Sequence, residues 1–154
     1  MGVRNYRDVP RVYFDFDGTT GDFVGTAAAQ GMTPTQFKRV AGAYRHLPLI
    51  AGASEAIDRV EALGLDPWGL TKIPGTNPYA ATEKLLWTID MLPKLYDKVI
   101  ISPDKGAVGT ARDFLVDDMP KWANAQNFPG TLIPFTGDWD AVFDVIMAKL
   151  GVTA

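Results

Sequence analysis

The stretch Val12-Tyr13-Phe14-Asp15-Phe16, followed by Asp17-Gly18-Thr19, is the part of the sequence that decides the fold. Its aromatic and β-branched residues predict a buried strand. Asp15 and Asp17 are two positions apart, so an extended backbone places both carboxylates on the same face. Gly18 then allows a sharp turn. Two carboxylates held this close repel each other unless a cation or a proton lies between them, so the stretch predicts a strand that ends in a charged site.

Outward from this stretch, short apolar segments alternate with segments of helical spacing. Further strands are expected at residues 68–71, 98–102, 114–118 and 131–135. Helices are expected at residues 33–46, 52–62, 79–91, 119–127 and 139–150. Pro134 predicts an edge position for the last strand, because proline cannot donate a hydrogen bond to a neighbouring strand. The alternation predicts an α/β fold with a five-stranded, mainly parallel sheet that is covered on both faces.

Two packing predictions follow from the apolar residues. Helical spacing predicts that the inner face of the helix at residues 79–91 consists of Ala80, Leu85, Leu86, Ile89 and Leu92. Large aromatic side chains usually anchor a core, so we expect this role for all four tryptophans, which are Trp68, Trp87, Trp122 and Trp139.

The composition is that of one globular domain. The chain has 154 residues, of which 47% are hydrophobic and 21% charged, so we expect a single domain over residues 1–154. Residues 20–51, between the first two expected strands, are more residues than a simple crossover connection needs. We expect them to form a small cap. The net charge of −3 argues against nucleic acid as a partner. No apolar run suits a membrane span or a signal peptide, so we expect a cytoplasmic protein.

Polar and charged residues follow each of the first four expected strands. Besides Asp15 and Asp17, these strand ends carry Thr71-Lys72, Ser102 with Asp104-Lys105, and Asp117-Asp118. The carboxyl ends of parallel strands meet at one edge of a sheet, where ligands bind. Four carboxylates there predict a hard divalent cation, in particular Mg²⁺, and the lysines predict an anion. The combination fits a phosphate, whose oxygens need charge neutralisation during transfer.

The Asp-x-Asp-Gly pattern also suits other kinds of site. A solvated turn is the simplest alternative, because Asp and Gly are common after strands. A calcium loop needs Gly at its sixth position and Glu at its twelfth, and these positions hold Thr20 and Thr26 when counted from Asp15, which excludes it. Cysteine is absent and His46 is the only histidine, so thiol chemistry, histidine metal sites and histidine triads are excluded. The apolar strand before the motif favours a catalytic site over a plain turn.

The strand-end residues resemble, in order, the four motifs of the haloacid dehalogenase-like phosphatases. Asp15-Phe16-Asp17-Gly18-Thr19 matches the first motif, and Thr71, Lys105 and Asp117-Asp118 resemble the other three. Within that superfamily the chain is most similar to the 5'(3')-deoxyribonucleotidases, over residues 11–145. This similarity rests on Asp22-Phe23, residues 47–57 (LPLIAGASEAI), Glu83-Lys84-Leu85-Leu86-Trp87, Asp104-Lys105 and residues 114–118. It implies a Rossmann-like three-layer sandwich with a cap inserted after the first strand.

The resemblance also implies the catalytic and metal-binding roles. Asp15 would be the nucleophile and would form an aspartyl-phosphate, which divides one difficult step into two easier ones. Asp17 would protonate the leaving oxygen and then deprotonate water. Mg²⁺ would be held by Asp15, by the backbone carbonyl of Asp17, and by one of Asp117 and Asp118. The sequence does not distinguish between these last two.

Substrate contacts are implied in the same way. Thr71 and Lys105 would bind the phosphoryl oxygens, and Lys72 could replace a phosphate contact that is missing at Pro103. Lys84 would contact the phosphate or tune the nearby acids, with a solvated helix lysine as the equal alternative. The aromatic residues that could stack on a nucleobase, or simply belong to the core, are Phe23, Phe37 and Tyr44.

The sequence departs from the family pattern at two motif positions and in its length. Lys72 stands where the second motif usually has serine, Pro103 stands where arginine is frequent, and the expected cap is shorter than the family's. The prediction is a Mg²⁺-dependent phosphomonoesterase that hydrolyses a deoxynucleoside 5'-monophosphate. Its partner would be this small molecule and not a membrane, and a homodimer stays open. The alternatives are a phosphatase for another small phosphoester or a nucleic-acid end, and a non-catalytic binding module with the same fold.

Overall fold

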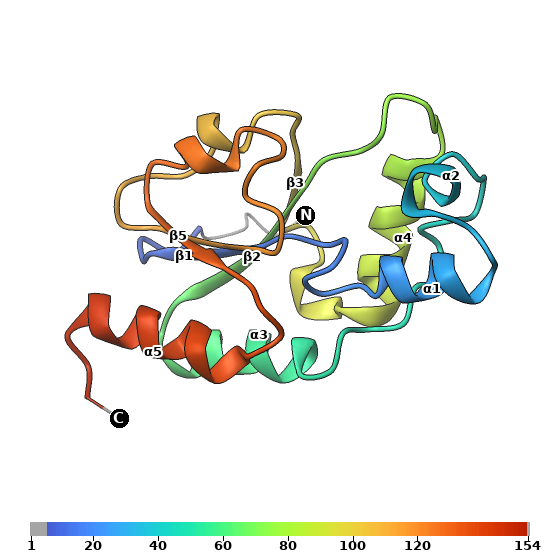
Figure 1. Cartoon of the computed structure of the whole chain (residues 1–154). Helices are drawn as coiled ribbons and strands as arrows, with labels where there is room; N and C mark the ends of the chain where they lie inside the picture. The colour runs from blue at the N-terminus through green and yellow to red at the C-terminus, as the bar shows by residue number, and fades with distance from the viewer. Residues whose placement is uncertain (1–5, 154) are drawn as a thin grey trace, which may run out of the picture.

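The computed structural model describes residues 6–153 and contains a five-stranded sheet in which all neighbouring strands are parallel. The strands are β1 (Arg11–Phe14), β2 (Asp66–Thr71), β3 (Val99–Ile101), β4 (Phe114–Asp117) and β5 (Thr131–Pro134). Their spatial order is β3-β2-β1-β4-β5, so β1 is central (Figure 1). The predicted α/β fold is confirmed, and β5 with its Pro134 is an edge strand.

The helices group on one face and at one end of this sheet. The α-helices are α1 (Phe23–Ala29), α2 (Pro34–Phe37), α3 (Ala53–Ala62), α4 (Ala80–Met91) and α5 (Trp139–Leu150). Three short 3₁₀ helices are η1 (Pro93–Leu95), η2 (Lys105–Ala107) and η3 (Ala125–Asn127). Figure 1 shows α3 and α5 together beneath the sheet, with α1, α2 and α4 gathered beyond one end of it. In the part of the chain that the structure describes, none of these helices combines the length and apolarity that crossing a membrane requires.

The two faces of the sheet bury separate clusters of side chains. Val12 and Phe14 of β1 belong to the larger cluster, which includes α3 and α5 residues. Tyr13 points to the opposite face, where it joins Leu115 and Phe128. This alternation is the period of two that a β-strand imposes. Both faces are therefore covered, but the second face is covered by η2, η3 and their turns instead of α-helices.

The helix predicted at residues 119–127 does not form. Only η3 is helical there, and the preceding residues Met119 to Asn124 run through turns. Ala123 and Asn124 adopt left-handed backbone conformations, with φ of 53° and 55°. Left-handed residues do not continue a right-handed helix, so the favourable composition of this segment is overridden locally.

The helix predicted at residues 33–46 is also shorter than expected. Thr33 caps α2 as predicted, in a capping box with Gln36, but α2 ends at Phe37. The chain continues in turns to residue 46, and Gly42 has a φ of 89°. Phe37 is nevertheless buried, so the segment packs through its apolar side chains without helical continuity.

The predicted inner face of α4 is correct for Ala80 and Leu92, which are buried, and wrong for its three other residues. Leu85, Leu86 and Ile89 are 45%, 40% and 46% exposed. The residues of this helix that are buried are Ala80, Glu83, Lys84, Trp87 and Thr88. Apolar spacing predicts burial when a helix packs on an apolar core, but α4 directs its polar residues towards the end of the sheet where the charged strand ends lie.

Candidate active site

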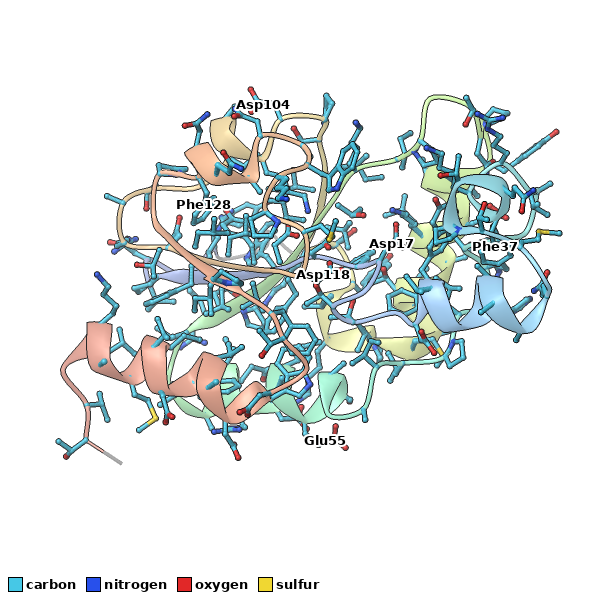
Figure 2. The ribbon with its side chains drawn as sticks, in the orientation of Figure 1. Asp17, Phe37, Glu55, Asp104, Asp118 and Phe128 are labelled. Atoms are coloured by element: carbon cyan, nitrogen blue, oxygen red, sulfur yellow. The ribbon has the colours of Figure 1, made fainter. Side chains whose placement is uncertain are left out.

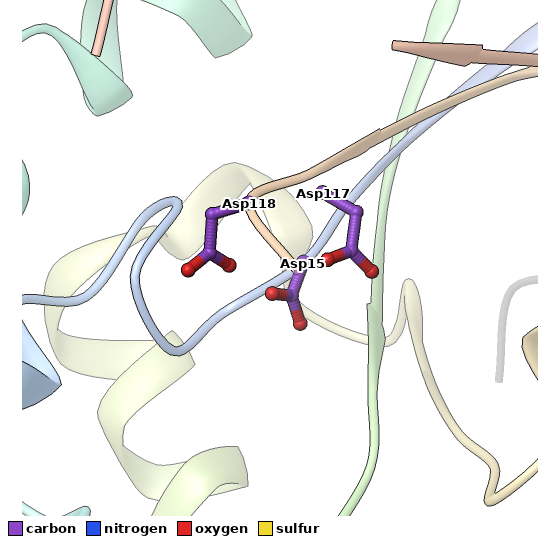
Figure 3. A group of neighbouring side chains, drawn as sticks. All are labelled: Asp15, Asp117 and Asp118. Atoms are coloured by element: carbon purple, nitrogen blue, oxygen red, sulfur yellow. The ribbon is translucent and has the colours of Figure 1, made fainter. Parts of the chain in front are cut away.

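Three carboxylates meet at the carboxyl ends of β1 and β4. Asp15 directly follows β1, Asp117 is the last residue of β4, and Asp118 comes next. Phe14 pairs with Val116 across the two strands, and the Asp15 amide donates a hydrogen bond to the Val116 carbonyl at 3.0 Å. Each of the three side chains offers an oxygen, and these oxygens all lie within 4.8 Å of one another (Figure 3). The strand register thus brings residues about a hundred positions apart into one site.

Lys105 is buried between two of these carboxylates. Its Nζ donates hydrogen bonds to Asp15 Oδ1 at 2.9 Å and to Asp117 Oδ2 at 2.8 Å. Burial alone would lower the pKa of Lys105, but the carboxylates of Asp15 and Asp117 outweigh it and raise that pKa above its ordinary value. Lys105 is therefore a fixed cation in the site, as its sequence position predicted.

Asp117 and Asp118 have different surroundings, although they are adjacent in the chain. Asp117 is occupied at both oxygens, because Oδ1 accepts from the Met119 amide at 2.8 Å and Oδ2 accepts from Lys105. Asp118 Oδ1 accepts a longer hydrogen bond, 3.2 Å, from the Thr19 hydroxyl. Burial, then a side-chain hydrogen bond with Asp15, and then the negative charges of Asp15 and Asp117 raise the pKa of Asp118 to about 8. A cation close to Asp118 would remove this unfavourable crowding of negative charge.

The turn after β1 packs against the side chain of Asp118. Gly18 has a φ of 84°, and a Cβ at this position would lie 2.2 Å from Asp118 Oδ2. Any other residue would therefore meet both backbone strain and a collision with the carboxylate. The Thr19 hydroxyl accepts from the Asp118 amide at 3.2 Å. Gly18 and Thr19 together hold the first strand end against the fourth.

Asp17 is held by a lysine on α4. Lys84, which is 2% exposed, donates from Nζ to Asp17 Oδ2 at 3.0 Å, to Thr71 Oγ1 at 2.8 Å and to the Lys72 carbonyl at 2.6 Å. This excludes the alternative of a solvated lysine and fits its role beside the acids. Asp17 Oδ1 is buried and has no hydrogen-bond partner among residues 6–153. That oxygen is therefore an unsatisfied acceptor inside the site.

The four carboxylates and Lys105 line one cavity of about 310 Å³. Figure 2 shows Asp17 and Asp118 between the sheet and the helical segment that carries Phe37. The remaining lining side chains come from that segment and from the loops after β2, β3 and β4. They include Lys38, Tyr44, Lys72, Lys105 and Trp122. The sequence motifs predicted Lys72 and Lys105 as phosphate contacts, and Tyr44 was one of the aromatic residues that could stack on a nucleobase. No motif predicted Lys38 or Trp122 as a site residue.

Four of the residues considered as substrate contacts, Phe23, Phe37, Thr71 and Lys84, are not among the residues that line this cavity. Phe23 is 6% exposed, stacks on Tyr44 at 5.1 Å and lies 5.0 Å from Phe37. The expected stacking of Phe23 on a nucleobase therefore does not fit its position, because its ring already packs within the segment of α1 and α2. Thr71 is 1% exposed and its hydroxyl is bonded to Lys84 and Lys72. It lies directly beneath the site.

A second cavity, of about 450 Å³, lies far from this chemistry, around the amino ends of β1 and β4. Its acidic residues are already engaged: Asp113 accepts from the Arg11 and Thr110 amides, and Asp8 pairs with Arg112. In parallel sheets, ligands bind at the carboxyl ends of the strands. The smaller cavity is therefore the candidate active site. Comparison of the chain with protein-family models and with curated proteins finds no match.

Proposed function

We propose that this chain is a Mg²⁺-dependent phosphomonoesterase and that its substrate is a deoxynucleoside 5'-monophosphate. The observation that carries the proposal is a cavity at the carboxyl end of a parallel sheet, lined by four carboxylates and the buried Lys105, with the buried Lys84 bonded to one of those carboxylates. Carboxylates supply a nucleophile and an acid, and lysines neutralise a phosphoryl group. The choice of a nucleotide comes from the resemblance to deoxyribonucleotidases.

The residues present fit a magnesium ion. Asp15 and Asp118 offer hard oxygen ligands, and burial together with the neighbouring carboxylates raises the pKa of Asp118, which a bound cation would counteract. Asp117 would contribute negative charge near the ion without binding it directly, since its two oxygens already accept hydrogen bonds from the Met119 amide and from Lys105. The Asp17 carbonyl would be a further ligand. When bound, Mg²⁺ supplies charge neutralisation for the carboxylates and the incoming phosphate.

The proposed reaction has two steps. The Asp15 carboxylate forms a bond to phosphorus while the bond between phosphorus and the ester oxygen breaks, and Asp17 gives its proton to that oxygen. Asp17 then takes a proton from water, which attacks the aspartyl-phosphate and releases inorganic phosphate with Asp15 regenerated. Lys84 keeps the Asp17 carboxylate in place throughout. Lys72, which is exposed at the cavity, would bind the phosphoryl oxygens with Lys105.

The proposal is tested by measuring phosphate release from deoxynucleoside monophosphates, sugar phosphates and an aryl phosphate. We expect release with Mg²⁺ and none with EDTA, and a loss of about a thousandfold or more in Asp15→Asn. Asp140→Asn is the matched control, because Asp140 is exposed on α5 and pairs with Arg59. Activity that survives both EDTA and Asp15→Asn would refute the mechanism. Equal rates on all substrates would retain the phosphatase and remove the nucleotide preference.

A further inference from the structure

Trp122 differs from the other tryptophans of the chain. It is 64% exposed, whereas Trp68, Trp87 and Trp139 are at most 9% exposed. The expectation that Trp122 anchors the core is therefore wrong. An indole ring left in water forgoes the gain from burying its apolar surface, so its exposure calls for a reason. Trp122 lines the same cavity as the carboxylates.

The loop that carries Trp122 is held in a costly conformation. The two residues after it, Ala123 and Asn124, both have positive φ. Asparagine tolerates this region, but alanine avoids it, and strain of the kind seen at Ala123 persists mainly at functional sites, where the surrounding structure enforces it. The Trp122 amide donates to the Met119 carbonyl at 3.0 Å, which closes the turn that displays the ring.

This loop is fastened to the loop that carries Lys105. The Lys105 amide donates to the Ala123 carbonyl at 2.7 Å, and Asn124 Nδ2 donates to Asp104 Oδ1 at 2.7 Å. Gly106 permits the contact, because a Cβ there would lie 2.5 Å from Asn124 Nδ2 and 3.0 Å from the Asn124 carbonyl oxygen. The position of Trp122 is thus fixed relative to the lysine that would hold the phosphate.

We propose that the Trp122 indole stacks on a planar aromatic ring in the leaving group of the substrate. This inference rests on the proposed phosphatase function and adds the residue that binds the leaving group. A cavity of about 310 Å³ lies at the lower end of the range for small-molecule sites and has room for a phosphate together with a ring system. Because Asp15, Lys105 and Trp122 line the same cavity, a phosphate at Asp15 and Lys105 leaves the rest of the ester in the cavity that Trp122 also lines. Stacking accepts any flat ring, so both a nucleobase and a phenyl ring fit.

The kinetic test compares two aromatic substrates, dTMP and 4-nitrophenyl phosphate, with glycerol 3-phosphate, which has no ring. Trp122→Ala is expected to raise KM by about tenfold for the aromatic substrates, as loss of one stacking contact does, with a clearly smaller change for glycerol 3-phosphate. Trp122→Phe keeps a ring and is expected to restore most of the difference. The matched control is Tyr79→Ala, since Tyr79 is 59% exposed and outside the cavity lining.

Each outcome of the kinetic test either supports or overturns the inference. An effect on dTMP alone assigns the ring to a nucleobase, and an effect on both aromatic substrates assigns it to flat rings in general. A Trp122→Ala enzyme that loses affinity equally for all three substrates, or for none, overturns the inference while the phosphatase function stands.

A binding test does not depend on turnover. Trp122 is the exposed indole, so collisional quenching of fluorescence by acrylamide reports mainly on it. In Asp15→Asn with Mg²⁺, we expect dTMP to reduce this quenching by at least about twofold, and glycerol 3-phosphate to have little effect. Trp122→Phe in the same background removes the signal. If the wild-type chain hydrolyses none of the esters, the proposed function fails, and protection by dTMP still supports an aromatic ligand at Trp122. Equal quenching with and without dTMP overturns the inference.

Discussion

Lys84 shows how one side chain can define a site. It lies on α4, a helix that exposes three large apolar residues, and it is buried together with Glu83. A buried lysine is stable only when it is paired, and Lys84 is bonded to Asp17, Thr71 and the Lys72 carbonyl. Its ammonium also lies 4.7 Å from the centre of the Tyr44 ring. Lys84 thus contacts the end of β2, the turn after β1 and, through Tyr44, the turns that follow α2.

Replacing Lys84 by methionine preserves most of the side-chain volume and removes the charge. We expect kcat to fall by about a hundredfold, the scale of a misplaced general acid, because Asp17 loses the donor that holds it. KM and the Mg²⁺ concentration for half-maximal activity should change much less. Steady-state kinetics with a magnesium titration measures all three. The control is Lys94→Met, since Lys94 is exposed and pairs with Asp58 at 2.7 Å; a rise in KM at constant kcat would instead assign Lys84 to substrate binding.

At the scale of an element, α4 has an orientation that its composition does not reveal. Trp87 is 2% exposed, its Nε1 donates to the Leu47 carbonyl at 2.8 Å, and its ring lies 5.4 Å from Phe16. Its neighbour Leu86 is 40% exposed. The helix is therefore anchored by one aromatic residue and by its polar contacts, while its leucines face outward.

This orientation predicts very different costs for neighbouring substitutions in α4. Trp87→Ala removes a buried ring and a hydrogen bond, and we expect it to lower the free energy of unfolding by about 3–5 kcal/mol. Leu86→Ala should lower it by about 0.5 kcal/mol or less. Urea denaturation followed by circular dichroism gives both values. Comparable losses at the two positions would contradict this orientation of α4.

At the scale of the whole molecule, the acidic cluster makes stability depend on pH. Burial and the neighbouring carboxylates raise the pKa of Asp118 to about 8, and burial with Asp15 also raises the pKa of Asp117 against the effect of Lys105. The folded metal-free chain therefore holds protons that the unfolded chain releases near pH 4. Stability from this source is complete below pH 4 and is lost as pH rises towards 8.

We accordingly expect the melting temperature in EDTA to fall by several degrees between pH 5 and pH 8. Saturating Mg²⁺ should reverse most of this loss, because a cation that binds only the folded chain stabilises it. Thermal unfolding at a series of pH values, with EDTA or Mg²⁺, measures both effects. Asp118→Asn is the control and should flatten the EDTA curve. A melting temperature in EDTA that rises from pH 5 to pH 8 would contradict the predicted crowding of charge.

Much of the architecture could be predicted because it depends on local patterns. Val12 to Phe14 are β-branched or aromatic, and they lie in the central strand, Arg11–Phe14. The helix at 139–150 was predicted with its observed bounds, Trp139–Leu150, and in the structure Asp138 caps it and Gly151 ends it. The carboxylates at the ends of β1 and β4 were expected to meet, because parallel strands bring their carboxyl ends to one edge.

The sequence by itself determined the order of the strands along the chain and the chemistry at the strand ends, because both depend on residues close together in the chain. Only the tertiary structure decided which side chains face the site. It buries Lys84 against Asp17, packs Phe23 against Tyr44, and leaves Trp122 exposed at the cavity. These outcomes depend on contacts between segments tens of residues apart, and such contacts override the local preference of an aromatic residue for burial or of a lysine for water.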